Sequence, residues 1–210
     1  MPGLIHGLDV ERIRRNLERA LERAGTSVEI LAATKYVPVD EMGALAEAGV
    51  TLVGENRLQD LEAKRDRWAD AFTWDFIGNL QSRKVKSIVP IVRLIHSVAT
   101  DSALSQLKRH APAETEVLVE VNVAGESGKG GLAPEELGGF IARCPVRVVG
   151  LMTMPPFSTD PEASRPFFAR LAELAAEHRL ERLSMGTSQD WEVAIEEGAT
   201  IVRLGTTLYA

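Results

Sequence analysis

The chain has 210 residues, of which 45% are hydrophobic and 26% are charged, the composition of an ordinary globular protein. The net charge of −6 argues against a nucleic-acid partner, and no stretch reaches the ~20 consecutive apolar residues of a membrane span. The single cysteine, Cys144, excludes an internal disulfide, and the N-terminal residues show no secretion signal, so we expect a cytoplasmic protein.

Strand-like apolar stretches recur eight times and alternate with helical patterns. The expected strands are 28–34, 50–53, 73–77, 94–97, 117–122, 147–151, 182–184 and 200–204. The expected helices are 9–24, 38–48, 57–69, 101–110, 134–143, 161–178 and 189–197. In the first helix the apolar face is expected to include Val10, Ile13, Leu17, Ala20, Leu21 and Ala24, and Gly25 is expected to end the helix.

Strands that alternate with helices of about ten residues indicate βαβ units and a parallel sheet. Eight such units close into a barrel more readily than they form an open sheet, and an eightfold barrel needs roughly 200 residues. We therefore predict one α/β domain over residues 1–210, a (β/α)8 TIM-type barrel. A doubly wound open sheet is the alternative.

Lys35 follows directly on the first strand, and in a (β/α) barrel the working residues lie at the carboxyl ends of the strands. It is either a solvated loop lysine or a partly buried amine that forms a Schiff base with an aldehyde. The first strand would neighbour the eighth, and the eighth the seventh. The segments 186–188 and 205–207, after those two strands, are either turn and cap residues or a cradle for a phosphate group. An amine facing a phosphate cradle is the arrangement that a pyridoxal phosphate Schiff base requires.

Arg203 lies on the last strand, where a buried guanidinium needs a partner. It could form a structural ion pair with a carboxylate or donate to a ring nitrogen. Other polar residues at or just beyond strand ends are Asn56, His96, Asn122 and Lys129. A single histidine at such a place is more often structural than catalytic. The sequence has no convincing metal-ligand spacing and no nucleotide-binding glycine pattern.

Eight short motifs allow a comparison with a known family. They lie at 32–35, 54–56, 76–81, 95–98, 122–123 with Lys129 and Gly131, 150–154, 183–186 and 202–206. In this order they resemble the pyridoxal phosphate homeostasis proteins. Thr187 replaces a methionine common in that family and Trp191 follows Asp190, so we expect a slightly different phosphate loop.

The resemblance implies a barrel like the N-terminal domain of alanine racemase, with pyridoxal 5′-phosphate (PLP) bound covalently to Lys35. It also implies roles for six other residues. Ser188, Gly205 and Thr206 would bind the phosphate, Arg203 would face the pyridine nitrogen, and Asn56 and Met152 would line the cofactor face. No residue is expected to be catalytic, and no metal is expected.

The family resemblance implies a non-catalytic PLP-binding protein that carries or buffers the cofactor and influences amino-acid and keto-acid balance. Whether client enzymes receive the cofactor stays open, and the expected assembly is a monomer or weak dimer. Arg203 cannot readily give a proton to the ring, and Tyr36 is expected to point to the strand face opposite Lys35, leaving no second acid/base. One alternative is a low-activity PLP-dependent enzyme such as an amino-acid racemase. Another is a cofactor-free Schiff-base aldolase that acts on phosphosugars.

Overall fold

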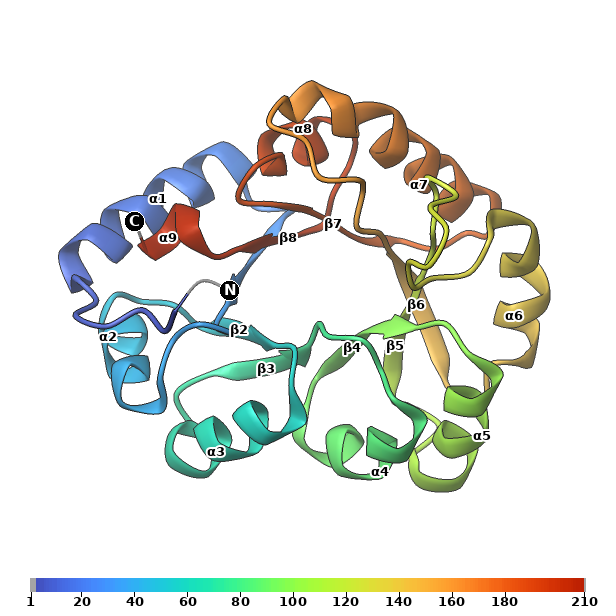
Figure 1. The fold of residues 1–210 in the computed structure, drawn as a ribbon, viewed down its shortest axis with the longest axis horizontal. Coiled ribbons are helices and arrows are strands. Elements are labelled where there is room, and N and C mark those ends of the chain that lie inside the picture. Colours follow the sequence, from blue (N-terminus) through green and yellow to red (C-terminus); the bar gives the residue numbers. More distant parts are fainter. Residues whose placement is uncertain (1–2, 210) are drawn as a thin grey trace.

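Eight parallel strands close into a barrel in the order of the sequence (Figure 1). The computed structural model describes residues 3–209. The strands are β1 Glu29–Ala33, β2 Leu52–Glu55, β3 Thr73–Phe76, β4 Leu94–Val98, β5 Glu116–Glu120, β6 Arg147–Met152, β7 Arg182–Thr187 and β8 Ile201–Leu204. The ring closes where residues 29–32 of β1 pair with residues 201–204 of β8. The predicted (β/α)8 TIM-type barrel is therefore confirmed, and the open-sheet alternative is wrong.

A ring of helices surrounds the strands (Figure 1). The helices are α1 Val10–Ala24, α2 Met42–Glu47, α3 Leu58–Trp68, α4 Val85–Ile88, α5 Asp101–His110, α6 Leu137–Arg143, α7 Arg165–Glu177, α8 Trp191–Glu196 and α9 Thr206–Tyr209. The short α9 lies against α1, where the Asn16 side chain donates to the Leu208 carbonyl at 3.2 Å. Within residues 3–209, no helix combines the length and the apolar character needed to cross a bilayer.

Helix α1 begins and ends as its sequence predicts. The Asp9 carboxylate accepts a hydrogen bond from the Arg12 N–H at 3.0 Å, and Gly25 ends the helix with a φ of 68°. The buried face consists of Ile13, Leu17, Ala20 and Ala24. Leu21, expected on this face, is 46% exposed because it lies beyond the edge of the buried stripe.

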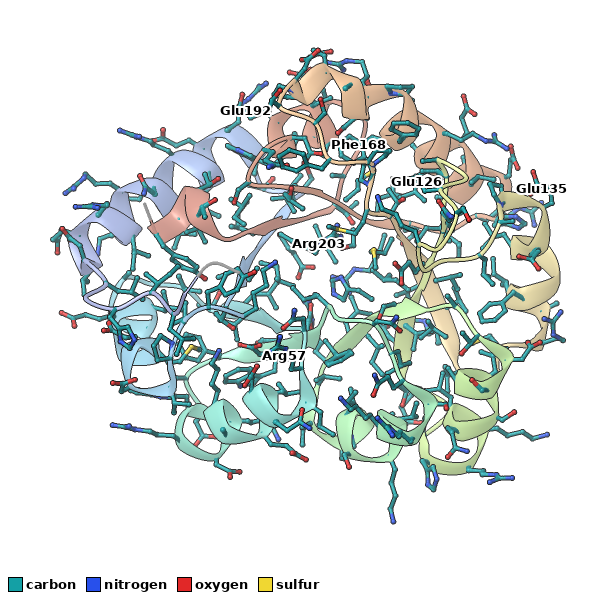
Figure 2. The ribbon with its side chains drawn as sticks, viewed as in Figure 1. Arg57, Glu126, Glu135, Phe168, Glu192 and Arg203 are labelled. Atoms are coloured by element: carbon teal, nitrogen blue, oxygen red, sulfur yellow. The ribbon has the colours of Figure 1, made fainter. Side chains whose placement is uncertain are left out.

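Alternation along the strands creates two apolar cores. The larger core lies between strands and helices, and Phe168 on α7 belongs to it (Figure 2). The smaller core consists of Leu31, Leu52, Leu94, Leu118, Met152 and Ile201. On β8, Ile201 belongs to the smaller core and Val202 to the larger, so the two-residue period directs Arg203 inward as well (Figure 2).

Two strands end at least two residues later than the sequence predicted. Strand β2 was expected at 50–53 but runs to Glu55, and β7 continues past the expected end at 184 to Thr187. Glycine and glutamate are depleted in strands, so the pattern seemed to end at Val53. The structure tolerates the fully buried Glu55 because the Lys64 ammonium forms an ion pair with it.

Two short helices were not predicted. Helix α4 and helix α9 have four residues each, too few to show a helical period in the sequence. The expected helices 38–48 and 161–178 are also not uniform. Each starts with a 3₁₀ turn, Val39–Glu41 and Pro161–Ser164, before α2 and α7 begin.

Candidate functional site

A cavity of about 560 Å³ opens at the carboxyl ends of the strands, a size typical of small-ligand sites. All seven site residues predicted from the sequence line it: Lys35, Asn56, Met152, Ser188, Arg203, Gly205 and Thr206. They come from five strands or the loops that follow them, which are β1, β2, β6, β7 and β8. A second cavity of about 210 Å³ lies between α1 and the strands. It is lined mainly by apolar side chains, so it has few groups that could bind a polar ligand or take part in a reaction.

Lys35 lies in a turn after β1 and is exposed. Its Nζ atom is 5.0 Å from the centre of the Tyr36 ring, and both side chains line the large cavity. The prediction that Tyr36 points away from Lys35 is therefore wrong. Strand β1 ends at Ala33, so the alternation of a strand does not extend to residues 35 and 36.

A buried ion pair lies next to the Lys35 turn. Lys64 on α3 pairs with Glu55 at the end of β2, and these side chains are 4% and 0% exposed. The Glu55 carboxylate also accepts a hydrogen bond from the Thr34 hydroxyl at 2.6 Å. The polar groups around the Thr34 backbone therefore hold the start of this turn in place.

Backbone N–H groups after β8 converge on one oxygen atom. The Ser188 hydroxyl oxygen accepts from the Gly205 N–H at 3.0 Å and from the Thr207 N–H at 3.2 Å. Thr206 lines the cavity between them. Thr207 belongs to the segment 205–207 that the sequence indicated as a phosphate cradle, but here its N–H donates to Ser188. Two N–H groups aimed at one oxygen form an anion-binding arrangement that a phosphate oxygen fits.

Arg203 is buried but none of its hydrogen bonds within residues 3–209 goes to a carboxylate. Its Nη1 donates to the Ser184 carbonyl at 2.7 Å, and its Nη2 donates to the Thr153 carbonyl at 2.9 Å and contacts the Met154 sulfur. Burial lowers the pKa of the guanidinium to about 10, against the opposing charges of Asp190 and Glu120. The group is therefore a cation at neutral pH.

His96 and Asp75 lie inside the barrel, fully buried. The His96 Nε2 is 3.1 Å from an Asp75 oxygen, and its Nδ1 is 2.8 Å from the Ser184 hydroxyl. Burial lowers the pKa of His96, with the Asp75 carboxylate opposing, so the imidazole is neutral at neutral pH. Burial acts to raise the pKa of Asp75, but hydrogen bonds from His96 and Arg93 outweigh it and lower the value.

Two more ionisable groups in the cavity were missed as site residues. Glu120 is the last residue of β5, and burial raises the pKa of its carboxyl group while the charge of Arg203 opposes the rise. Tyr209 also lines the cavity and donates its hydroxyl to the Ala33 carbonyl at 3.2 Å. Burial raises the Tyr209 pKa, and the Glu55 charge adds to the rise, so the phenol stays protonated.

Asn56 provides a direct test of whether a polar ligand fits. Its side-chain oxygen is buried in the cavity wall and has no hydrogen-bond partner among the described residues. A buried polar atom without a partner is costly, so a ligand that donates a hydrogen bond there would remove the cost. This atom and the N–H groups around Ser188 are the features that PLP would fit.

Of the four polar residues named at strand ends, His96, Asn122 and Lys129 do not line this cavity. Asn122 bonds within its own loop, donating to the Glu126 carbonyl at 2.9 Å. Lys129 forms an ion pair with Glu126 and donates to the Pro155 carbonyl at 3.2 Å. Residues 3–209 contain no cluster of three or more acidic, histidine or cysteine side chains placed to hold a metal ion.

Comparison with known proteins identifies the family. The model of the family "Alanine racemase, N-terminal domain" matches residues 8–210. The pyridoxal phosphate homeostasis protein of Aquifex aeolicus is 43% identical, over 95% of this chain and 96% of its own length. The chain belongs to the pyridoxal phosphate homeostasis protein family. Another family member, from Pseudomonas aeruginosa, is 36% identical over 96% of this chain and 93% of its own length.

Solved structures of similar proteins have the same fold as this chain. PipY of Synechococcus elongatus, with PLP bound, superposes with a TM-score of 0.84 at 30% identity, covering 94% of this chain and all of its own. Alanine racemase from Corynebacterium glutamicum has a TM-score of 0.77 at 16% identity and covers all of this chain but 63% of its own. At that identity the racemase shows a shared barrel, and no shared activity follows from it.

Proposed function

We propose that this protein binds PLP and serves PLP homeostasis without catalysing a reaction, and that it thereby affects amino-acid and keto-acid balance. The observation that carries the proposal is a single cavity lined both by Lys35 and by Ser188, Gly205 and Thr206. The names of the curated relatives and the PLP bound to PipY support the same ligand.

Three groups of PLP would each have a partner in the cavity: the phosphate, the aldehyde and the pyridine nitrogen. The phosphate would lie against Ser188, Gly205 and Thr206, where it would replace the Ser188 oxygen as the acceptor of the Gly205 N–H and would itself accept from the Ser188 hydroxyl. The Lys35 amine would bond covalently to the cofactor aldehyde, and Arg203 would face the pyridine nitrogen. When bound, PLP supplies that aldehyde and an electron-accepting ring. Asn56 and Met152 would line the cofactor face, with the Asn56 oxygen gaining the partner it lacks.

The charges in the cavity favour binding over catalysis. With a pKa of about 10, Arg203 keeps its proton at neutral pH and does not transfer it to a ring nitrogen. The Tyr209 phenol, whose pKa is raised by burial, stays protonated and cannot accept a proton from a bound amino acid. A site with these two groups would retain the cofactor while promoting proton removal from a bound amino acid only weakly.

Borohydride reduction of protein incubated with PLP tests the covalent bond. Peptide mapping should then place the pyridoxyl group on Lys35, and Lys35→Ala should abolish labelling. Lys84→Ala is the matched control and should be labelled like the wild type. A pyridoxyl group on Lys129 or Lys84 would contradict the proposal, and a protein without the visible or near-visible absorption of a PLP Schiff base would favour the aldolase alternative.

Tyr36 supports a second candidate function, a low-activity PLP-dependent enzyme such as an amino-acid racemase. Tyr36 lines the cavity together with Lys35 and is a second group there that can donate or accept a proton. Racemisation assays on alanine and serine separate the two functions. Activity that is lost in Tyr36→Phe, with PLP affinity unchanged, would support the enzyme.

A further inference from the structure

Hydrogen bonds link four side chains in a line across the inside of the barrel. Arg203 Nη1 on β8 lies 2.5 Å from the Ser184 hydroxyl on β7, which lies 2.8 Å from His96 Nδ1 on β4. His96 Nε2 lies 3.1 Å from an oxygen of Asp75 on β3. The four side chains belong to residues that are at most 5% exposed, so water does not compete for these contacts.

The chemistry of the donors fixes the direction of this line. Arginine can only donate, so the Ser184 oxygen accepts from Arg203 and the Ser184 proton is left to donate to His96 Nδ1. The Asp75 carboxylate can only accept, so a neutral His96 carries its proton on Nε2, and its Nδ1 is the acceptor that faces the Ser184 hydroxyl. Arg93 completes the line by donating to both Asp75 oxygens, at 2.7 and 3.0 Å.

A cationic His96 would break this pattern. Its Nδ1–H would donate to the Ser184 oxygen, so the Ser184 proton would lose its acceptor inside the barrel. The charged groups that act on His96 are the Asp75 carboxylate and two guanidinium groups, those of Arg93 and Arg203. A cationic imidazole would therefore be repelled by two guanidinium groups and attracted by one carboxylate, that of Asp75.

We propose that Ser184 and His96 are positioning residues for Arg203, with His96 held as the neutral Nε2–H tautomer. The Ser184 hydroxyl and the two backbone carbonyls hold the guanidinium in one orientation, and His96 keeps that hydroxyl turned so that its lone pair meets Arg203. That this orientation of Arg203 affects PLP binding rests on the proposed function. The tautomer of His96 does not depend on any ligand.

Nitrogen-15 NMR of the cofactor-free protein with labelled histidine tests the tautomer. The chain has four histidines, and replacing His6, His110 and His178 by glutamine leaves the His96 signals alone. We expect an Nε2–H imidazole whose shifts stay constant from about pH 8 to pH 6, and Ser184→Ala should move the Nδ1 signal. A proton on Nδ1, or titration near the ordinary value of about 6.5, would overturn the proposal.

Cofactor binding tests the positioning role. Ser184→Ala should weaken PLP binding about tenfold, the scale of one hydrogen bond to a charged group, and should shift the absorption maximum of the bound cofactor. Thr200→Val is the matched control, because it removes a hydroxyl that bonds to the Leu183 N–H between the same two strands. Wild-type affinity and spectrum in Ser184→Ala would overturn the role. If the wild type itself failed to bind PLP, the proposed function would be wrong. The imidazole signals would still show whether His96 is the neutral Nε2–H tautomer that accepts from Ser184.

Discussion

The Lys64 ammonium donates a hydrogen bond to the carbonyl oxygen of Thr34 at 2.7 Å, directly before Lys35 in the chain. The same ammonium is the ion-pair partner of Glu55, which accepts the Thr34 hydroxyl. One buried lysine on α3 therefore fixes the position of the turn that carries a second lysine into the cavity. Only the second lysine lies at the end of a strand, so the sequence drew attention to it alone.

Removal of this buried cation should destabilise the protein strongly. Lys64→Met leaves the Glu55 carboxylate buried without its ion-pair partner, and we expect a loss of about 3–5 kcal/mol in the free energy of unfolding. Urea denaturation measures it, with the exposed Lys108→Met as control. The double variant Glu55→Gln with Lys64→Met should recover part of the loss. A change in Lys64→Met no larger than that of the control would show that the pair contributes little.

The loops after β7 and β8 should bind the phosphate of PLP. Ser188→Ala removes a hydroxyl hydrogen bond to a charged group, which corresponds to about 1.5–3 kcal/mol or roughly ten- to a hundredfold in affinity. Titration of cofactor absorbance measures it. Ser105→Ala, an exposed hydroxyl on α5, is the control.

Gly205 offers an independent test of the same loops. A Cβ atom added there meets only the Ala33 carbonyl, at 3.8 Å, so Gly205→Ala should fold normally. Gly205→Val should weaken PLP binding more than Gly205→Ala, because a larger side chain blocks the approach of the phosphate to the backbone. Unchanged affinity in both Ser188→Ala and Gly205→Val would show that the phosphate lies elsewhere.

Arg203 should limit any carbanion chemistry on the bound cofactor. Arg203→Glu places a carboxylate where it favours a protonated ring, so we expect weaker or altered PLP binding together with measurable exchange of the α-proton of a bound amino acid. Arg203→Gln, which carries no charge, should show no such exchange. Proton NMR in heavy water follows the reaction. Wild-type racemisation at the roughly 1–10³ s⁻¹ typical of enzymes would instead establish the catalytic alternative.

Protonation of His96 should make the protein less stable in mild acid. Because burial lowers its pKa in the folded state, the unfolded chain binds the proton more tightly. The stabilisation is complete above the unfolded pKa of about 6.5 and declines as the pH falls below it, by up to about 1.4 kcal/mol per pH unit. Urea denaturation from pH 7 to 5 should show a flatter dependence for His96→Gln than for the wild type. Parallel curves would mean that His96 is not the responsible group.

The sequence determined the barrel and seven of the residues that line the cavity. Strand and helix periods are local properties, and eight alternating units leave few ways to bury every apolar face. Because parallel strands end at one face of a barrel, residues after different strands were expected to meet, and Lys35, Ser188 and Gly205 do line one cavity. The pattern could not predict where β2 ends, because a buried Glu55 is tolerable only with Lys64 beside it.

Only the tertiary structure decided which polar groups are partners. His96 and Ser184 are 88 residues apart, and Tyr209 reaches the Ala33 carbonyl across 176 residues. Side-chain hydrogen bonds of this kind depend on strand register and on the point where each strand ends, and neither leaves a periodic trace in the sequence. Tyr36, which was predicted to point away from Lys35, lines the same cavity for the same reason. Strand β1 ends at Ala33, so Lys35 and Tyr36 lie in a turn and do not alternate between two faces as strand residues do.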